Sequence, residues 1–341
     1  RTDIRHSLPM RRYRTLIFML LIAAIIAGLF VYGRYLGGGS VTGGTFVETC
    51  LADGNMWHTM APRRNGVEID GEERAGCMTA DGANHFSSYD EYRAAKEPGD
   101  STVSLAPGDY QSGTKSTLTF SIRSNGEVPV LFKQHERYLH VIIISKDKKT
   151  FAHIHPDDQP GFGEENVRQG EFQVDYTFER GGEYLIAVDY ANQLKHESKT
   201  FRVDVKGSPQ GEEAQYPLSA EVSGLTIALS EPVLFADREE TVLVSVLKDG
   251  TPVTLMPYLG AAMHVAVVKN DLTEFIHAHG EVHVPGSTGK VLSHVHAPPP
   301  ASFTAPIELH VVIPEPGLYT LFSEIQYEGT VIRVPFTVRV E

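Results

Sequence analysis

The segment His140-Val-Ile-Ile-Ile-Ser-Lys-Asp-Lys-Lys-Thr-Phe-Ala-His-Ile-His155 recurs 124 residues later as His264-Val-Ala-Val-Val-Lys-Asn-Asp-Leu-Thr-Glu-Phe-Ile-His-Ala-His279. In each copy an apolar run reaches a polar turn and continues as a second short run, a pattern that predicts a β-hairpin. Three histidines stand at matching places in both copies. The residues that are identical under this offset are His140, Val141, Asp147, Phe151, His153 and His155.

The repeat extends over most of the chain beyond residue 100. The same offset aligns Thr117–Ile122 with Thr241–Val246, and the turn dipeptide Asn125-Gly126 with Asp249-Gly250. After His155 the offset becomes 135, which indicates an insertion of eleven residues in the second copy. We therefore predict an internal duplication.

Each copy offers roughly seven short strands, a count that fits an immunoglobulin-like or cupredoxin-like β-sandwich. Gly182-Glu-Tyr184 and Gly317-Leu-Tyr319 resemble the stretch that forms a tyrosine corner in such sandwiches. The predicted fold is mainly β, with an N-terminal transmembrane helix, a small disulfide-containing segment and two tandem sandwich repeats. The predicted domains are 1–44 (cytoplasmic N-terminus, signal anchor and Gly-rich tether), 45–100 (Cys-containing segment), 101–206 (repeat 1) and 207–341 (repeat 2, with a histidine-rich insertion).

The anchor is predicted from the uncharged apolar run Leu16–Tyr32, which follows Arg11, Arg12 and Arg14. As a helix this run rises about 26 Å, and an extension to Leu36 reaches the roughly 30 Å hydrocarbon core. The arginines predict a single-pass cell-membrane protein with its N-terminus in the cytoplasm and its C-terminal domains outside. The alternative is a cleaved signal peptide, which would give a secreted protein.

The charge of the chain excludes one class of partner. The formal net charge is −13, and residues 1–44 hold six Arg and one acid, so the remainder is still more acidic. Nucleic-acid binding needs basic patches that displace counterions, so no nucleic-acid partner is expected. An acidic exported portion would instead attract cations.

Residues 45–100 contain both cysteines of the chain, Cys50 and Cys77. Outside the cytoplasm a disulfide between them is the simplest expectation. The alternative is a soft-metal site for Cu(I) that combines the thiolates with Met56–Met60, Met78 and His85.

The strand pairing expected within each hairpin predicts where its histidines lie. A four-residue turn, Lys146–Lys149 in the first copy, places His140 opposite His155, and His153 two residues away shares their face. The same register clusters His264, His277 and His279 in the second copy. We expect each triad to lie at the end of its own sandwich, close enough for several imidazoles to bind one metal ion.

Further candidate ligands surround both triads. The alternative for all of them is a structural role, as satisfied strand-end histidines or as weak sites on a surface loop. His196 is interpreted as incidental. The candidates are His283, His294, His296 and His310 in the second copy, and His135, Asp157 and Asp158 in the first.

The ligand type indicates the metal. Imidazole-rich sites without an obligatory thiolate suit Cu(II), Zn(II) or Ni(II), and Cu(II) binds most tightly in similar geometry. Copper is therefore the predicted ion, with zinc as the alternative. Neither repeat contains cysteine, which excludes a blue-copper centre of the His2Cys type.

Four short motifs of the second copy together form a recognisable pattern: Tyr258-Leu-Gly-Ala261, His264-Val-Ala-Val-Val268, Phe275-Ile-His-Ala-His279 and Pro316-Gly-Leu-Tyr319. It resembles that of exported bacterial sandwich proteins associated with heavy-metal or copper handling. The resemblance covers residues 102–341 and implies metal binding or delivery outside the cytoplasm, with His264, His277 and His279 on the motif. The first copy departs from it at Gln134–Leu139, so its site could be altered.

Two functions follow from these patterns. The leading hypothesis is a membrane-anchored extracytoplasmic metal-binding protein that acts as chaperone, buffer or sensor, with a transport or surface partner that the sequence does not identify. The alternative is a structural or adhesive cell-surface protein of tandem immunoglobulin-like domains with no metal role. The sequence has no Ser-His-Asp ordering, phosphate-binding Gly loop or H-E-x-x-H motif, so no enzymatic activity is predicted.

Overall fold

The computed structural model describes residues 45–69, 72–80, 82–283 and 299–341. These residues fall into two compact units, one ending at Tyr92 and the other running from Arg93 to Glu341. The predicted anchor Leu16–Tyr32 and the candidate ligands His294 and His296 lie outside the described residues. None of the helices within the described ranges has the length and apolar character that crossing a membrane requires.

The first unit is a small antiparallel sheet to which a helix is joined by the predicted disulfide. Cys50 on α2 (Phe46–Ala52) is bonded to Cys77 on β4 (Arg74–Met78), which confirms that prediction. The strand order is β1-β4-β5-β2-β3. The other elements are β1 (Met56–Met60), β2 (Arg63–Arg64), β3 (Val67–Glu68), β5 (His85–Phe86) and α3 (Tyr89–Lys96).

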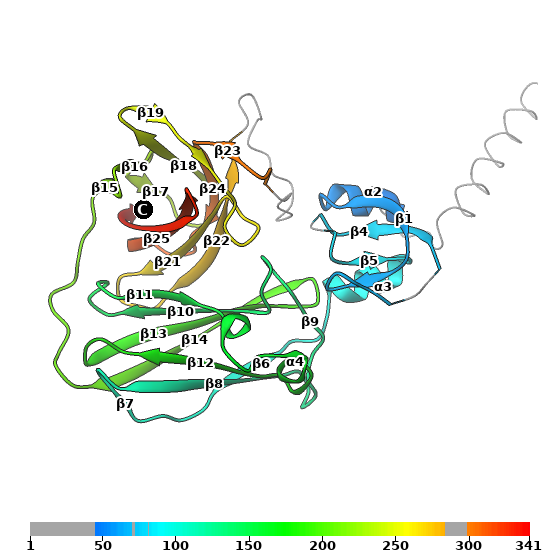
Figure 1. The fold of residues 1–341 in the computed structure, drawn as a ribbon, viewed down its shortest axis with the longest axis horizontal. Coiled ribbons are helices and arrows are strands. Elements are labelled where there is room, and N and C mark those ends of the chain that lie inside the picture. Colours follow the sequence, from blue (N-terminus) through cyan, green and yellow to red (C-terminus); the bar gives the residue numbers. More distant parts are fainter. Residues whose placement is uncertain (1–44, 70–71, 81, 284–298) are drawn as a thin grey trace, which may run out of the picture. The chain divides into compact units, whose positions relative to one another are not determined.

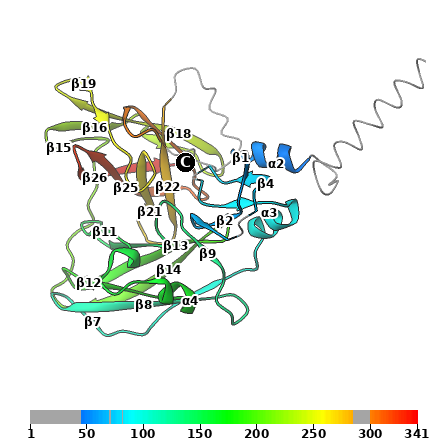
Figure 2. The same ribbon diagram turned by 45° about the vertical axis from the view of Figure 1, so that its right-hand side comes forward.

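The first repeat is a sandwich of two sheets (Figures 1 and 2). One sheet has the order β11-β10-β13-β14-β7, with β9 beside β13, and the other has the order β12-β8-β6. Alternate residues of β8, such as Leu118, Phe120 and Ile122, are fully buried because successive side chains of a strand point to opposite faces. The elements are β6 (Thr102–Leu105), β7 (Tyr110–Gln111), β8 (Lys115–Arg123), β9 (Leu131–Phe132), β10 (Leu139–Ser145), β11 (Phe151–Ile154), η1 (Pro156–Asp158), α4 (Glu164–Gln169), β12 (Glu171–Thr177), β13 (Gly182–Asn192) and β14 (Lys195–Lys206).

In the second repeat the corresponding strands join into one continuous sheet, β15-β16-β18-β24-β22-β21-β25-β26-β17, with β19 beside β18. The join occurs at Gly280, which pairs with Met263 on one side and Leu309 on the other. A Cβ at this position would lie 2.5 Å from Ile307, so the close approach requires glycine. The elements are β15 (Ser219–Val222), β16 (Leu225–Leu229), β17 (Val233–Leu234), β18 (Glu239–Lys248), β19 (Thr251–Pro252), β20 (Thr254–Leu255), β21 (Met263–Lys269), β22 (Phe275–Val282), β23 (Phe303–Thr304), β24 (Ile307–Val312), β25 (Gly317–Tyr327) and β26 (Thr330–Val340).

Local features predicted from the sequence recur at equivalent places in the two repeats. The hydroxyl of Tyr184 donates to the carbonyl of Arg180 at 2.9 Å, and that of Tyr319 to Glu315 at 2.8 Å. These bonds confirm the tyrosine corners, and the strands and sheets of the two repeats confirm the mainly β, immunoglobulin-like architecture.

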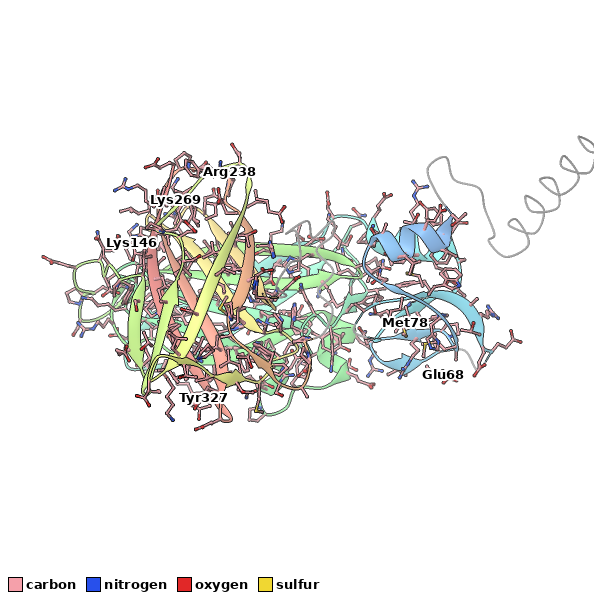
Figure 3. The ribbon with its side chains drawn as sticks, turned by 90° about the horizontal axis from the view of Figure 1, so that it is seen from above. Glu68, Met78, Lys146, Arg238, Lys269 and Tyr327 are labelled. Atoms are coloured by element: carbon pink, nitrogen blue, oxygen red, sulfur yellow. A yellow bond between two sulfur atoms is a disulfide. The ribbon has the colours of Figure 1, made fainter. Side chains whose placement is uncertain are left out.

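The two repeats pack together through an apolar layer that is separate from their own cores. The ring of Phe151 stacks on that of Phe322 with centroids 4.6 Å apart. The buried Lys148 donates from Nζ to the carbonyl of Asn270 at 2.7 Å, which links the two hairpin turns. Figure 3 labels Lys146 and Lys269, which stand at the turn ends of these hairpins. The layer consists of Ile142, Ile144, Leu185 and Ala187 from the first repeat and Ala266, Val268, Leu272 and Phe322 from the second.

We expect Phe322→Ala to lower the free energy of unfolding of the second unit by about 3–5 kcal/mol, because it removes a buried aromatic ring and leaves a cavity between the repeats. Denaturant unfolding followed by near-ultraviolet circular dichroism measures this loss. Phe235→Ala is the matched control, since the Phe235 side chain is 40% exposed and its loss should change stability little. Equal effects of the two substitutions would contradict a packed inter-repeat layer.

Candidate metal centre

Both hairpins have the register expected from the sequence. In the first, Val141 lies opposite Ile154 and Ile144 opposite Phe151. In the second, His264 lies directly opposite His279. Because opposed residues share a face, the three histidines of each copy gather on one side of their hairpin.

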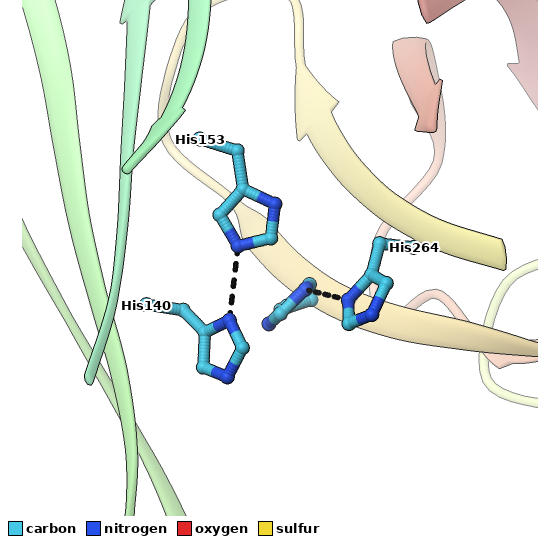
Figure 4. A group of neighbouring side chains, drawn as sticks. His140, His153 and His264 are labelled. Atoms are coloured by element: carbon cyan, nitrogen blue, oxygen red, sulfur yellow. Dashed lines mark hydrogen bonds between the residues drawn. The ribbon is translucent and has the colours of Figure 1, made fainter. Parts of the chain in front are cut away.

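The place of these triads differs from the prediction. Neither lies at the end of its own sandwich; both face the other repeat and are buried between the two. Strand periodicity identifies the shared face of a hairpin but carries no information about what covers that face. Figure 4 shows His140 and His153 of the first repeat turned toward His264 of the second. All six histidines of the two triads are at most 9% exposed: His140, His153, His155, His264, His277 and His279.

One nitrogen from each of four histidines lies in a common space. These ligand atoms, from His140, His153, His264 and His277, are all within 4.8 Å of one another. A second group of three, His135, His264 and His279, meets the same condition and shares His264 with the first. The sequence predicted two separate triads, whereas the structure joins them into one histidine cluster.

The hydrogen bonds assign which nitrogen of each imidazole can bind a cation. Nε2 of His140 lies 3.0 Å from the carbonyl of Gln134, and Nε2 of His264 lies 3.0 Å from that of Tyr258. A carbonyl only accepts, so these nitrogens carry the protons and Nδ1 of each ring presents a lone pair. The two bonds are equivalent in the two repeats.

The remaining two imidazoles are oriented by carboxylates of the opposite repeat. Nδ1 of His153 lies 2.6 Å from Oε2 of Glu324, and Nδ1 of His277 lies 2.8 Å from Oδ2 of Asp189. Each Nδ1–H donates, so Nε2 of each ring presents a lone pair. Metal-bound histidines commonly donate their other N–H to a carboxylate or carbonyl in this way.

The lone pairs approach one another closely. Nδ1 of His140 and Nε2 of His153 are 2.9 Å apart. Nε2 of His155 lies 3.2 Å from Nδ1 of His140 and 3.1 Å from Nε2 of His153. The corresponding pair in the second copy, Nδ1 of His264 and Nε2 of His277, is 3.4 Å apart. Two ligands on a tetrahedral ion with bonds of about 2.0–2.1 Å are roughly 3.3 Å apart. A divalent cation would therefore replace repulsion between lone pairs with coordination at nearly the existing spacing.

Burial favours the uncharged form of four imidazoles of the cluster. Burial lowers the pKa of His140, His153 and His264 well below the ordinary value, and neighbouring histidines add to the effect. Burial also lowers the pKa of His155 to about 4, although Asp158 opposes the shift. Neutral imidazole is the form that binds a metal ion.

The two buried carboxylates differ in their surroundings. Burial raises the pKa of Glu324, and the guanidinium of Arg333 only partly opposes this. Burial would also raise the pKa of Asp189, but His196 and His277 outweigh it and hold the pKa below its usual range. His196, interpreted from the sequence as incidental, donates to Oδ2 of Asp189 at 2.9 Å.

Sequence reasoning missed Asp189 and Glu324. Both stand in otherwise apolar stretches of β13 and β25, and the offset of 135 that relates the later strands aligns one with the other. A buried acid at the same position of two apolar strands is the signal that would have found them.

Several other predicted ligands lie apart from the cluster. Nδ1 of His283 contacts Glu308, and Nε2 of His310 lies 3.5 Å from the same carboxylate. Asp157 accepts from the backbone N–H of Tyr138. In the first unit the disulfide removes both thiolates from the soft-metal alternative, so that form of the site is wrong.

Acid should destabilise the metal-free protein. Above about pH 6.5, the ordinary value for a histidine, His155 is neutral in both the folded and the unfolded chain; between there and about pH 4 the unfolded chain binds a proton that native His155 does not. The free energy of unfolding should therefore fall as pH decreases through this window. Urea unfolding at several pH values measures it, and His155→Asn should make the dependence shallower. A stability that is constant between pH 6.5 and 4 would contradict buried neutral imidazoles.

No curated protein matches the sequence significantly. Among solved structures, similarity is found to the Escherichia coli adhesin FdeC (11% identity, 84% of this chain, 74% of that chain, TM-score 0.22) and to the Yersinia pseudotuberculosis adhesin InvE (16%, 70%, 58%, TM-score 0.20). The D0-D1 domain of intimin is also similar (12%, 71%, 97%, TM-score 0.18).

The family comparison is more specific. One family model matches the chain twice, over residues 95–207 and 220–341. Its description assigns no function, so the resemblance to heavy-metal-handling proteins stays an expectation. The chain belongs to the family described as Domain of unknown function (DUF8832).

Proposed function

We propose that this protein binds a divalent transition-metal ion in the histidine cluster between its two repeats, with copper as the expected ion and zinc as the alternative. The observation that supports this best is the close approach of Nδ1 of His140 and Nε2 of His153 at 2.9 Å, while the other nitrogen of each ring donates to an oxygen. The ligand atoms are already oriented, and their N–H groups already have acceptors.

The burial of the cluster bears on the role of the metal. Metal bound in this cluster would contact both repeats and would be buried, which favours retention over rapid delivery. Among the predicted roles, a buffer or a metal-stabilised surface protein fits this better than a fast-exchanging chaperone. The disulfide supports an extracytoplasmic location. The membrane anchor remains part of the proposal on the sequence argument alone.

A structural or adhesive surface role is the second candidate. The observation that favours it is the tandem of immunoglobulin-like sandwiches that this chain itself forms, an arrangement that can present a binding surface away from a cell. The two candidates are compatible, because a metal ion between the repeats would fix their relative orientation. The adhesive role needs no metal, so a chain that binds no metal would leave the second candidate alone.

Metal should raise the thermal midpoint of the full chain, purified without a polyhistidine tag, because an ion that binds only the native state stabilises it by mass action. At a hundredfold excess over the dissociation constant the gain is about 2.7 kcal/mol. Differential scanning calorimetry with micromolar Cu(II) or Zn(II) measures the shift.

The His153→Ala/His277→Ala variant should lose this shift. His310→Ala is the matched control and should keep it, because His310 contacts Glu308 and not the cluster. No shift in the wild type, or an equal shift in the double variant, would sink the metal proposal for this site.

A further inference from the structure

The two triads repeat the same internal geometry. The rings of His140 and His155 have centroids 4.9 Å apart and planes at 89°, and those of His264 and His279 are 4.7 Å apart, also at 89°. Each repeat therefore contributes three imidazole rings in the same arrangement.

The third histidine of each triad distinguishes two ways of occupying the cluster. One ion at the four-histidine centre would use His140 and His153 but not His155. Yet Nε2 of His155 lies 3.2 and 3.1 Å from the ligand nitrogens of these two rings, and its Nδ1 is held by Asp158 at 3.1 Å. Three nitrogens separated by 2.9–3.2 Å form one face of a tetrahedron around an ion.

One difference between the surroundings of the two triads concerns a possible ligand. His135 stands over the second triad, with its ring centroid 3.7 Å from that of His279 and 5.3 Å from that of His264. Under the offset of 124 the position equivalent to His135 is Leu259, and both residues have a φ of 47°. The backbone is thus the same in both repeats, but leucine has no ligand atom.

We propose that the cluster holds two metal ions, one on His140, His153 and His155 and one on His264, His277 and His279, and that His135 supplies a fourth imidazole to the second. This rests on the proposed function and goes beyond it. The second site is closed by four protein ligands, as in structural metal sites, whereas the first keeps a position open to a further ligand. The two ions therefore differ in how readily they leave.

Metal content measures the number of ions. The full chain and its variants are loaded with Zn(II), dialysed, and analysed by mass spectrometry of the metal. We expect His155→Ala and His279→Ala each to retain one ion fewer than the wild type, and His153→Ala/His277→Ala to retain two fewer. His310→Ala should match the wild type.

The outcomes separate the two proposals. Loss of a single ion in the double variant, with no loss in His155→Ala, means one ion at the four-histidine centre and overturns the two-ion proposal alone. No retained metal in the wild type overturns the proposed function as well. The test uses the metal content of the wild type minus that of the double variant. Ions bound at other sites contribute equally to both proteins and do not affect this difference.

Release kinetics measure the asymmetry. With excess of a colorimetric zinc chelator, the wild type should release one ion quickly and the other at least about tenfold more slowly, because a direct ligand should matter at least as much as an outer-shell partner, whose loss lowers metal affinity by about tenfold or more. His135→Leu should make the slow phase fast, and the reciprocal Leu259→His should slow the fast phase. A wild type whose two ions leave together, or a slow phase that His135→Leu leaves unchanged, would overturn the role of His135.

Discussion

The hydrogen bonds from His153 to Glu324 and from His277 to Asp189 cross between the repeats in opposite directions. Each repeat therefore supplies the acceptor that orients an imidazole of the other. In the low-dielectric layer between the sandwiches such bonds are costly to leave unmade, so the two repeats are interdependent. The same bonds leave both Nε2 atoms with lone pairs directed at the neighbouring histidines, and the chemistry of the centre follows from that.

The duplication explains why so many imidazoles meet in one place. One hairpin gathers three histidines on one of its faces. Two copies that pack with these faces together bury all six histidines between the repeats. The apolar part of the layer, with Phe151 stacked on Phe322, supplies the hydrophobic contribution to this packing. The polar part supplies ligands. Differences between the copies, such as His135 against Leu259, then allow two similar half-sites to differ in function.

Local features were predictable from the sequence because they depend on neighbouring residues. The hairpin register follows from the turn length and the alternation around it, and the tyrosine corners follow from short patterns. The disulfide follows from the presence of two cysteines in a chain that is expected to be exported. The position of the triads between the repeats could not be predicted, because alternation does not specify what a strand face packs against. Asp189 and Glu324 were recoverable from the offset of 135 together with their apolar neighbours.

The central claim is that neutral imidazoles of both repeats bind a metal ion directly. X-ray absorption spectroscopy of the zinc-loaded full chain tests it on the bound ion itself. The account predicts only nitrogen scatterers from the protein at about 2.0–2.1 Å, with the outer-shell pattern of several imidazole rings. A spectrum dominated by carboxylate or water oxygen, or one with a single imidazole per zinc, would contradict it.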